Sequence, residues 1–226
     1  MGFMPGNGAG QHAASWFIRS HPNVIKAFKD VWQTDEQLLT SMDTMICWRP
    51  WMADARGKEH WTPRVENLHV DQNPAHKRGK HGVQGMIPLY PVTKEVGGLQ
   101  VVPRSNTDAT QDDLREQYPW SIHYDSDWIP FTITDKHVGT GKLLLAEPGS
   151  LILWDSRTIH GGFLGVGPFD PTGNELLRLT MKVSMLPFSR WDRAKEPDLL
   201  RLRTEAVEQG VATSCWPHEF RKQPFT

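Results

Sequence analysis

The chain has 226 residues, an ordinary apolar fraction of 38% and a formal net charge of −1. This length fits one domain with a substantial core. The mixed charges give no electrostatic basis for binding nucleic acid or an anionic membrane surface. No apolar run approaches the roughly 20 residues that span a bilayer. We therefore expect one domain, residues 1–226, with neither a nucleic-acid nor a membrane partner, and composition leaves its oligomeric state open.

The expected location is the cytoplasm. Residues 1–8 lack the charged and apolar regions of a secretory signal peptide. The two cysteines, Cys47 and Cys215, allow at most one disulfide. In a reducing compartment we expect both thiols to be buried as small apolar groups.

The N-terminal part is predicted to be helical after a short arm. Residues 1–11 are rich in glycine and are expected to be flexible. Residues 12–41 form the predicted helical flank. His21-Pro22-Asn23 opens one helix with apolar residues at helical spacing, and Thr34 and Gln37 match a capping box that predicts a second helix.

From residue 42 onward, short apolar runs alternate with glycine, proline and asparagine. Such a rhythm predicts a mainly β domain, a double-sheet jelly roll or barrel over residues 42–186. The predicted strands are 42–48, 65–70, 83–90, 98–102, 142–146, 150–154 and 176–185. Residues 107–141 are predicted to hold a short helix at 111–117 and a long loop over the barrel mouth. The C-terminal extension, 187–226, contains a predicted charged helix at 195–209.

His69-Val70-Asp71 is the strongest candidate for chemistry when it is combined with His160. Side chains alternate faces along a strand, so His69 and Asp71 can hold one metal from the same face. Two imidazoles and one carboxylate form the facial triad of non-heme Fe(II), with open positions for substrate and oxygen. The tripeptide alone is more typical of a surface loop. His160, however, follows a predicted strand, and Gly161-Gly162 after it would let a cosubstrate approach the metal.

Arg178 is the second unusual residue, because it interrupts the apolar segment 176–181. A charge in such a strand is costly unless it is paired. Its partner is either an internal carboxylate or the carboxylate of a cosubstrate held by two parallel hydrogen bonds. Thr180 lies on the same strand face and could add a hydroxyl donor.

Taken in order, these motifs resemble the phytanoyl-CoA dioxygenase family of Fe(II)/2-oxoglutarate oxygenases. Besides His69-Val70-Asp71 and Arg178, the matching stretches are GGLQVVPRSN at 97–106, similar to the family's G-G-L-x-V-V-P-G-S-H, and PGSLILWDSRTIH at 148–160. The resemblance implies a cupin-like double-stranded β-helix. It also implies Fe(II) held by His69, Asp71 and His160, with 2-oxoglutarate and O2 as cosubstrates.

The arginine that binds 2-oxoglutarate is expected to be Arg178, assisted by Thr180. The loop 163–174 is longer than the family pattern, so Arg157 remains the alternative. Arg157 lies three positions before His160, and strand geometry turns it to the opposite face.

The resemblance implies hydroxylation or another oxidation of a C–H bond in a small organic substrate, with release of succinate and CO2. Related halogenases replace the carboxylate ligand with a small residue, so the intact Asp71 favours hydroxylation. Three alternatives use the same residues: a non-catalytic cupin-like metal-binding protein, a zinc hydrolase and a peptide hydroxylase. Arg178 argues against the first, since a plain cupin needs no buried guanidinium near the metal.

Several further residues are expected around this site. The candidates for orienting the metal ligands are Asn67, Gln84 and Asp155. Trp48, Trp51 and Trp61 precede the metal strand and are candidates for lining a pocket. The basic loop 75–81 is either a solvated loop or a contact for an anionic part of the substrate. Other histidines that compete less well as ligands are His60, His76, His81, His123 and His137.

Overall fold

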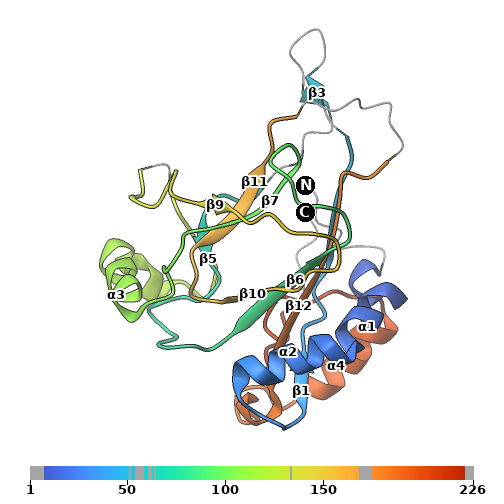
Figure 1. The fold of residues 1–226 in the computed structure, drawn as a ribbon. Helices are drawn as coiled ribbons and strands as arrows, with labels where there is room; N and C mark the ends of the chain where they lie inside the picture. The colour runs from blue at the N-terminus through green and yellow to red at the C-terminus, as the bar shows by residue number, and fades with distance from the viewer. Residues whose placement is uncertain are drawn as a thin grey trace.

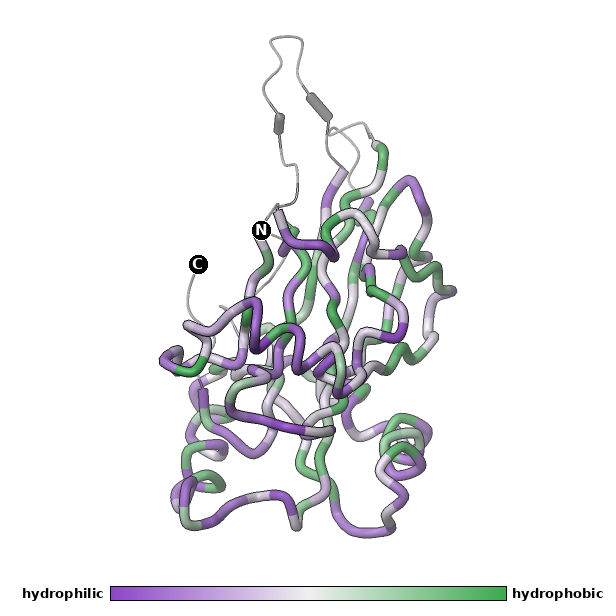
Figure 2. The backbone as a smooth tube through the Cα atoms, turned by 90° about the vertical axis from the view of Figure 1, so that its left-hand side faces the viewer, coloured by the Kyte–Doolittle hydropathy of each residue, from purple (hydrophilic) through white to green (hydrophobic). Residues whose placement is uncertain are grey.

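The computed structural model describes residues 8–50, 52–53, 59–60, 63, 65–132, 134–167 and 175–221, with residues 52, 53, 59 and 60 described in backbone only. Two antiparallel sheets face each other, and helices lie outside them (Figure 1). Hydrophobic and hydrophilic stretches alternate along the backbone (Figure 2).

Each of the two sheets has five strands. The first runs β1 (Leu38–Thr40), β12 (Arg178–Pro187), β6 (Val83–Pro88) and β10 (Ile152–Asp155), with β2 (Met45–Trp48) also paired to β12. The second runs β8 (Ile129–Pro130), β5 (His69–Val70), β11 (His160–Leu164), β7 (Gly97–Val101) and β9 (Lys142–Leu143). A separate hairpin pairs β3 (Met52–Ala53) with β4 (Glu59–His60).

The chain passes repeatedly between the sheets. It goes from β2 to β5, back to β6, then to β7 and β9, back to β10, across to β11 and finally to β12. This connectivity is that of a double-stranded β-helix, so the predicted mainly β, cupin-like jelly roll is confirmed. Each predicted strand overlaps an observed one. β1, β8 and β11 were not predicted as strands, and β11 carries two glycines, a residue type that is depleted in strands.

Helices cover both outer faces. η1 (Ala9–Gln11), α1 (Ala13–Ser20), α2 (Pro22–Trp32) and α4 (Leu199–Glu208) lie on the side of the first sheet, where η3 (Phe188–Arg190) also follows β12. α3 (Asp108–Gln117) and η2 (Pro119–His123) lie on the other side of the molecule (Figure 1). The helix predicted at 111–117 is therefore present and begins three residues earlier.

Strand alternation decides which side chains enter the space between the sheets. In β6 and β12 the odd-numbered apolar residues face outward, and four of them form one cluster with α2: Val83, Ile87, Val183 and Met185 pack on Val24 and Phe28. Because successive residues face opposite sides, the even-numbered residues of both strands point inward. Arg178, Thr180 and Lys182 thus share the inner face.

The second predicted N-terminal helix is wrong. Helix α2 ends at Trp32, and the capping residue Gln33 takes a left-handed conformation with φ 52°. Glu36 then accepts hydrogen bonds from the backbone N–H and hydroxyl of Ser189, at 2.9 and 2.8 Å. The chain continues into β1, which pairs with the end of β12. Tertiary pairing with β12 therefore overrides the local capping pattern, and the helix missed in this flank is α1.

Both ends of the described chain are more closely packed than the sequence predicts. Residues 8–11 were expected to belong to a flexible arm, but η1 buries Ala9 and Gly10, and Arg19 donates a hydrogen bond to the Gly10 carbonyl. Helix α4 begins at Leu199, four residues later than predicted, and buries that side chain. Cys47 and Cys215 are free and half-buried. In the described ranges, every helix is too short or too polar to cross a membrane.

Candidate active site

The two predicted histidine ligands lie directly opposite each other. His160 begins β11 and pairs in antiparallel register with His69 of β5. Residues opposite one another on neighbouring strands place their side chains in contact, and the two imidazole centroids are 4.5 Å apart. Both histidines are buried. A separation of 91 residues in sequence is thus closed by one strand pair within the second sheet.

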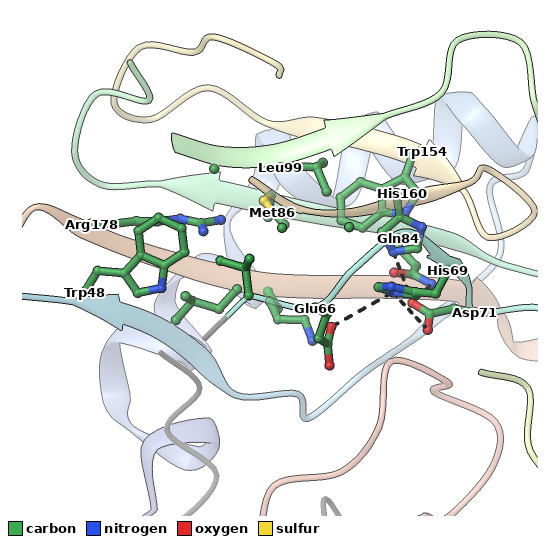
Figure 3. Close-up of a pocket in the computed structure, with 16 residues that line it drawn as sticks. Trp48, Glu66, His69, Asp71, Gln84, Met86, Leu99, Trp154, His160 and Arg178 are labelled. Atoms are coloured by element: carbon green, nitrogen blue, oxygen red, sulfur yellow. Dashed lines mark hydrogen bonds and ion pairs between the residues drawn. The ribbon is translucent and has the colours of Figure 1, made fainter. Parts of the chain in front are cut away.

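Asp71 completes the group. Its Oδ2 lies 3.3 Å from His160 Nε2 and its Oδ1 lies 3.8 Å from His69 Nε2. One ligand atom from each of the three residues falls within 4.8 Å of the others. The structure therefore brings together all three residues that the sequence predicted, with the donor set that suits Fe(II) (Figure 3).

The backbone fixes the orientation of both imidazole rings. His69 Nδ1 lies 2.7 Å from the Asn67 carbonyl oxygen, and His160 Nδ1 lies 2.8 Å from the Thr158 carbonyl oxygen. A carbonyl oxygen only accepts, so each Nδ1 carries the proton and each Nε2 offers its lone pair to a metal. Burial also lowers the pKa of His69 to about 4, which keeps this ring neutral at neutral pH.

Asp71 is held as a carboxylate. Burial alone would raise its pKa, but the close contacts with the His160 and His69 imidazoles and a hydrogen bond from Gln84 outweigh burial and leave the pKa well below its usual value. The Gln84 amide donates to Asp71 Oδ2 at 2.9 Å. Of the three candidates for orienting the ligands, Gln84 does so with its side chain and Asn67 with its backbone. Asp155 instead pairs with Arg157.

The glycines after His160 have a packing role that the sequence did not predict. A Cβ on Gly161 would lie 2.7 Å from the Asn67 carbonyl oxygen, and one on Gly162 would lie 2.6 Å from the Val65 Cβ. The missing side chains therefore admit the segment 65–67 against β11, and both glycines also line the pocket. Gly162 also donates its N–H to the Glu66 carbonyl at 2.7 Å.

A pocket runs between the sheets from the His–Asp–His group to Arg178 (Figure 3). Its walls are mainly apolar, and its lining includes Ile46, Trp48, Val65, Met86, Leu99 and Trp154. Trp48 is the member of the predicted tryptophan set that lies in this lining. Trp51 and Trp61 are outside the described residues.

Arg178 occupies the far end of the pocket. It is 5% exposed, stacks on Trp48 with 4.4 Å from its guanidinium carbon to the ring centroid, and donates from Nε to Thr180 Oγ1 at 3.2 Å. Among the residues that the structure describes, no carboxylate lies within ion-pair distance of it. Burial lowers its pKa to about 10, so it stays cationic at neutral pH. Thr180 holds the Arg178 side chain in place.

Arg157 belongs to a different environment. Its guanidinium pairs with Asp155 at 2.8 Å and with Asp108 at 3.0 Å, away from the pocket. The orientation predicted from its spacing to His160 is therefore correct. His76 and His123 are exposed, His81 and His137 are half-buried, and all four lie outside the pocket lining. The side chain of His60 is outside the described residues.

Two charged residues in the pocket were not predicted. Glu66 precedes the metal strand, and its Oε2 lies 3.9 Å from His69 Nε2. Lys182 faces inward from β12, and its Nζ lies 2.8 Å from the buried carboxylate of Asp43. Lys182 could have been predicted from the sequence, because it lies two residues after Thr180 and therefore on the same face of the strand. Glu66 lies outside β5, so strand periodicity gave no signal for it.

Comparison with known families agrees with this geometry. Residues 10–164 match the family described as Phytanoyl-CoA dioxygenase (PhyH). The chain belongs to the phytanoyl-CoA dioxygenase family. A relative from Aspergillus versicolor, "Ava biosynthesis cluster protein O", is 33% identical over 230 residues, covering 96% of this chain and 67% of the relative. The family resemblance expected from the sequence motifs is confirmed.

Solved structures are more distantly similar. EvdO2 from Micromonospora carbonacea var. aurantiaca aligns with 14% identity and a TM-score of 0.47, covering 77% of this chain and 63% of that one. EctD from S. alaskensis, solved with 2-oxoglutarate and 5-hydroxyectoine, aligns with 12% identity and a TM-score of 0.43, covering 78% and 52%. The chain thus spans less than two thirds of the length of these solved relatives.

Proposed function

We propose that this member of the phytanoyl-CoA dioxygenase family is an Fe(II)- and 2-oxoglutarate-dependent oxygenase. It would oxidise a C–H bond of a small organic molecule, with hydroxylation as the expected outcome. The observation that carries the proposal is the buried guanidinium of Arg178 at one end of the pocket and the His–Asp–His group at the other. The Aspergillus versicolor relative is named for a biosynthesis cluster, which supports a small-molecule substrate.

The residues fit the two groups that such a reaction needs. His69, Asp71 and His160 would hold Fe(II), because two neutral imidazoles and one carboxylate present three donors and leave the remaining positions open. Arg178 would bind the distal carboxylate of 2-oxoglutarate through its fork of N–H donors. When bound, iron with 2-oxoglutarate and O2 supplies an oxidant able to break an unactivated C–H bond.

The protein's own contribution is to orient these groups and to exclude water. The Asn67 and Thr158 carbonyls keep the imidazole protons on Nδ1, and Gln84 holds the Asp71 carboxylate in place. The apolar walls of the pocket keep water away from the path between Arg178 and the metal ligands. Asp71 fills the position that a halide would need, so hydroxylation is favoured over halogenation.

A non-catalytic cupin-like metal-binding protein is the main competing function. It would explain the His–Asp–His group but not Arg178, since burying a guanidinium without a carboxylate partner costs stability. An anionic ligand bound in the pocket would offset the cost of burying Arg178, and a protein that only binds a metal has no such ligand. The arginine therefore separates the two functions.

The test is anaerobic binding of 2-oxoglutarate to the Fe(II)-loaded protein, measured by calorimetry. Arg178→Gln removes the charge and should weaken binding on the order of 100-fold, the usual cost of removing one partner of a buried charge pair. Arg157→Gln is the matched control and should bind as tightly as wild type. Equal affinity in wild type and Arg178→Gln, or loss of binding only in Arg157→Gln, would assign the carboxylate elsewhere.

A further inference from the structure

Glu66 is a carboxylate at the metal end of the pocket that the proposed chemistry does not use. Its side chain is 47% exposed, and its Oε2 lies 3.9 Å from His69 Nε2, the nitrogen that would face the metal (Figure 3). It does not belong to the group of ligand atoms that lie within 4.8 Å of one another. Glu66 therefore stands beside the predicted metal position without being one of its ligands.

The other charged groups of the pocket each have a counter-charge. Lys182 is neutralised by the buried Asp43 at 2.8 Å. Under the proposed function, Arg178 pairs with the distal carboxylate of 2-oxoglutarate. The two charges of Fe(II) are balanced by Asp71 and by the carboxylate at the chelating end of 2-oxoglutarate. Glu66 is the one negative charge left over in the loaded site.

Compensation of this charge by the protein is indirect, because the nearby Lys182 is already paired with Asp43. Within the described part of the chain, the only basic group within 4 Å of the Glu66 carboxylate is His69, whose Nε2 faces the predicted metal position. The surrounding walls are apolar: Val65 precedes it, and Ile46 and Trp48 lie in the same lining. A carboxylate beside apolar walls favours a cationic partner, because a charged hydrogen bond there is stronger than in water.

We infer that Glu66 anchors the substrate and selects an organic cation, a molecule that carries an ammonium or guanidinium group next to an apolar body. The cation would bind the Glu66 carboxylate, and the apolar body would contact the pocket walls. Its position beside His69 would place carbons near the cation close to the metal. Glu66 is then a specificity-determining residue, and this role rests on the proposed function.

The segment that carries Glu66 is held firmly enough for such a role. The Glu66 carbonyl accepts the Gly162 N–H at 2.7 Å, and a Cβ on Gly162 would collide with Val65. Close packing on β11 thus fixes the backbone on both sides of Glu66. A fixed backbone limits the side chain to the rim of the metal site, which is the placement that a specificity residue requires.

The test uses the Fe(II)-loaded protein with 2-oxoglutarate under nitrogen, so that binding is measured without turnover. The probes are phenylalkyl amines with spacers from ethyl to pentyl, each compared by calorimetry with the alcohol and the carboxylate of the same skeleton. Wild type should bind at least one amine about tenfold more tightly than its alcohol, as expected for a hydrogen bond to a charged group. The carboxylates should bind most weakly.

Three variants complete the test. Glu66→Gln should reduce the preference for amines to near unity, and Glu66→Lys should reverse it in favour of the carboxylates. Glu116→Gln, which removes an exposed carboxylate on α3, is the matched control and should keep the wild-type preference. If wild type prefers no amine, or if Glu66→Gln retains the preference, the role of Glu66 is wrong.

Binding of 2-oxoglutarate is measured first in the same samples, which separates the two claims. If wild type does not bind 2-oxoglutarate, the proposed function fails, and the charge argument for Glu66 fails with it. If 2-oxoglutarate binds but the amine preference is absent, only the role of Glu66 is overturned.

Discussion

At the scale of single residues, the site depends on hydrogen bonds that fix the metal ligands before any metal arrives. Both imidazoles donate to backbone carbonyls, and Asp71 accepts from Gln84. Such partners set the tautomer and the direction of each ligand. The ligand atoms are therefore arranged by the fold, and only small movements are needed to bind a metal.

Gln84 is the partner that mutation can test most cleanly. Gln84→Leu removes the donor to Asp71 at similar side-chain volume. We expect Fe(II) affinity to fall by roughly 10–100-fold, the usual cost of losing such a partner. The measurement is anaerobic titration of Fe(II) against a competing chelator. An unchanged affinity, with the variant folded as judged by circular dichroism, would mean that Asp71 is oriented by other contacts.

At the scale of elements, two sets of contacts connect the site to the rest of the fold: the packing of residues 65–67 on β11 and the hydrogen bonds of Asn73. The glycines of β11 admit the segment 65–67, which carries both Glu66 and the carbonyl that orients His69. The second contact is made by Asn73, which comes three residues after the end of β5. It is fully buried and donates to the carbonyls of Ser121, Tyr124 and Ser126, at 2.9, 3.4 and 3.0 Å.

Gly161→Ala tests the packing of residues 65–67 on β11. The added methyl group would meet the Asn67 carbonyl, which must then move away from His69 Nδ1. We expect Fe(II) affinity to fall by roughly tenfold because the imidazole loses its orienting partner. The measurement is the same chelator competition, read beside the free energy of unfolding. Loss of stability without loss of affinity would contradict this role.

Asn73→Asp tests the hydrogen bonds that Asn73 donates to the loop carbonyls. The aspartate keeps the acceptor for the Ala75 N–H but replaces an amide donor with a carboxylate that repels the loop carbonyls. We expect the free energy of unfolding to fall by about 2–3 kcal/mol, the cost of breaking a buried polar network. Hydrogen exchange should also quicken across residues 119–128. If exchange there matches the wild type, the loop is held by its apolar contacts alone.

The sequence predicted the strands better than it predicted the irregular segments that connect them. Alternating apolar residues and turn signals located seven strands of the double-stranded β-helix, and the order of motifs identified the family. Strand periodicity placed His69, Asp71, Arg178 and Thr180 on inward faces. By contrast, the helix at 34–37 was wrong because pairing with β12 competes with a local cap. Glu66 was missed because it lies in irregular chain that only the glycines of β11 hold in place.

At the scale of the whole molecule, buried histidines make stability depend on pH. Burial lowers the pKa of His218 to about 4, and the ring packs edge-on against Trp216 with 5.5 Å between centroids. The ordinary histidine pKa is 6.5, so between pH 6.5 and 4 the unfolded chain binds more protons than the folded one. The free energy of unfolding should therefore fall as pH falls through this window, with His218 contributing about 3 kcal/mol at most.

Chemical denaturation of the metal-free protein at several pH values measures this slope. His218→Phe keeps an aromatic ring beside Trp216 but cannot be protonated, so its curve should fall less steeply between pH 6.5 and 4. His69, whose pKa is lowered in the same direction, should account for part of the slope that remains. Identical slopes in wild type and His218→Phe would show that His218 titrates normally in the folded protein.

The proposed function requires the metal ligands at one end of the pocket and Arg178 at the other end to act in one reaction. The most direct measurement is succinate formed from 2-oxoglutarate when O2 is added to the anaerobically Fe(II)-loaded protein. We expect slow substrate-free turnover in wild type, lost in Asp71→Ala and in Arg178→Gln and kept in Arg157→Gln. Iron binding without any 2-oxoglutarate binding or succinate formation in wild type would contradict it and favour a metal-binding protein.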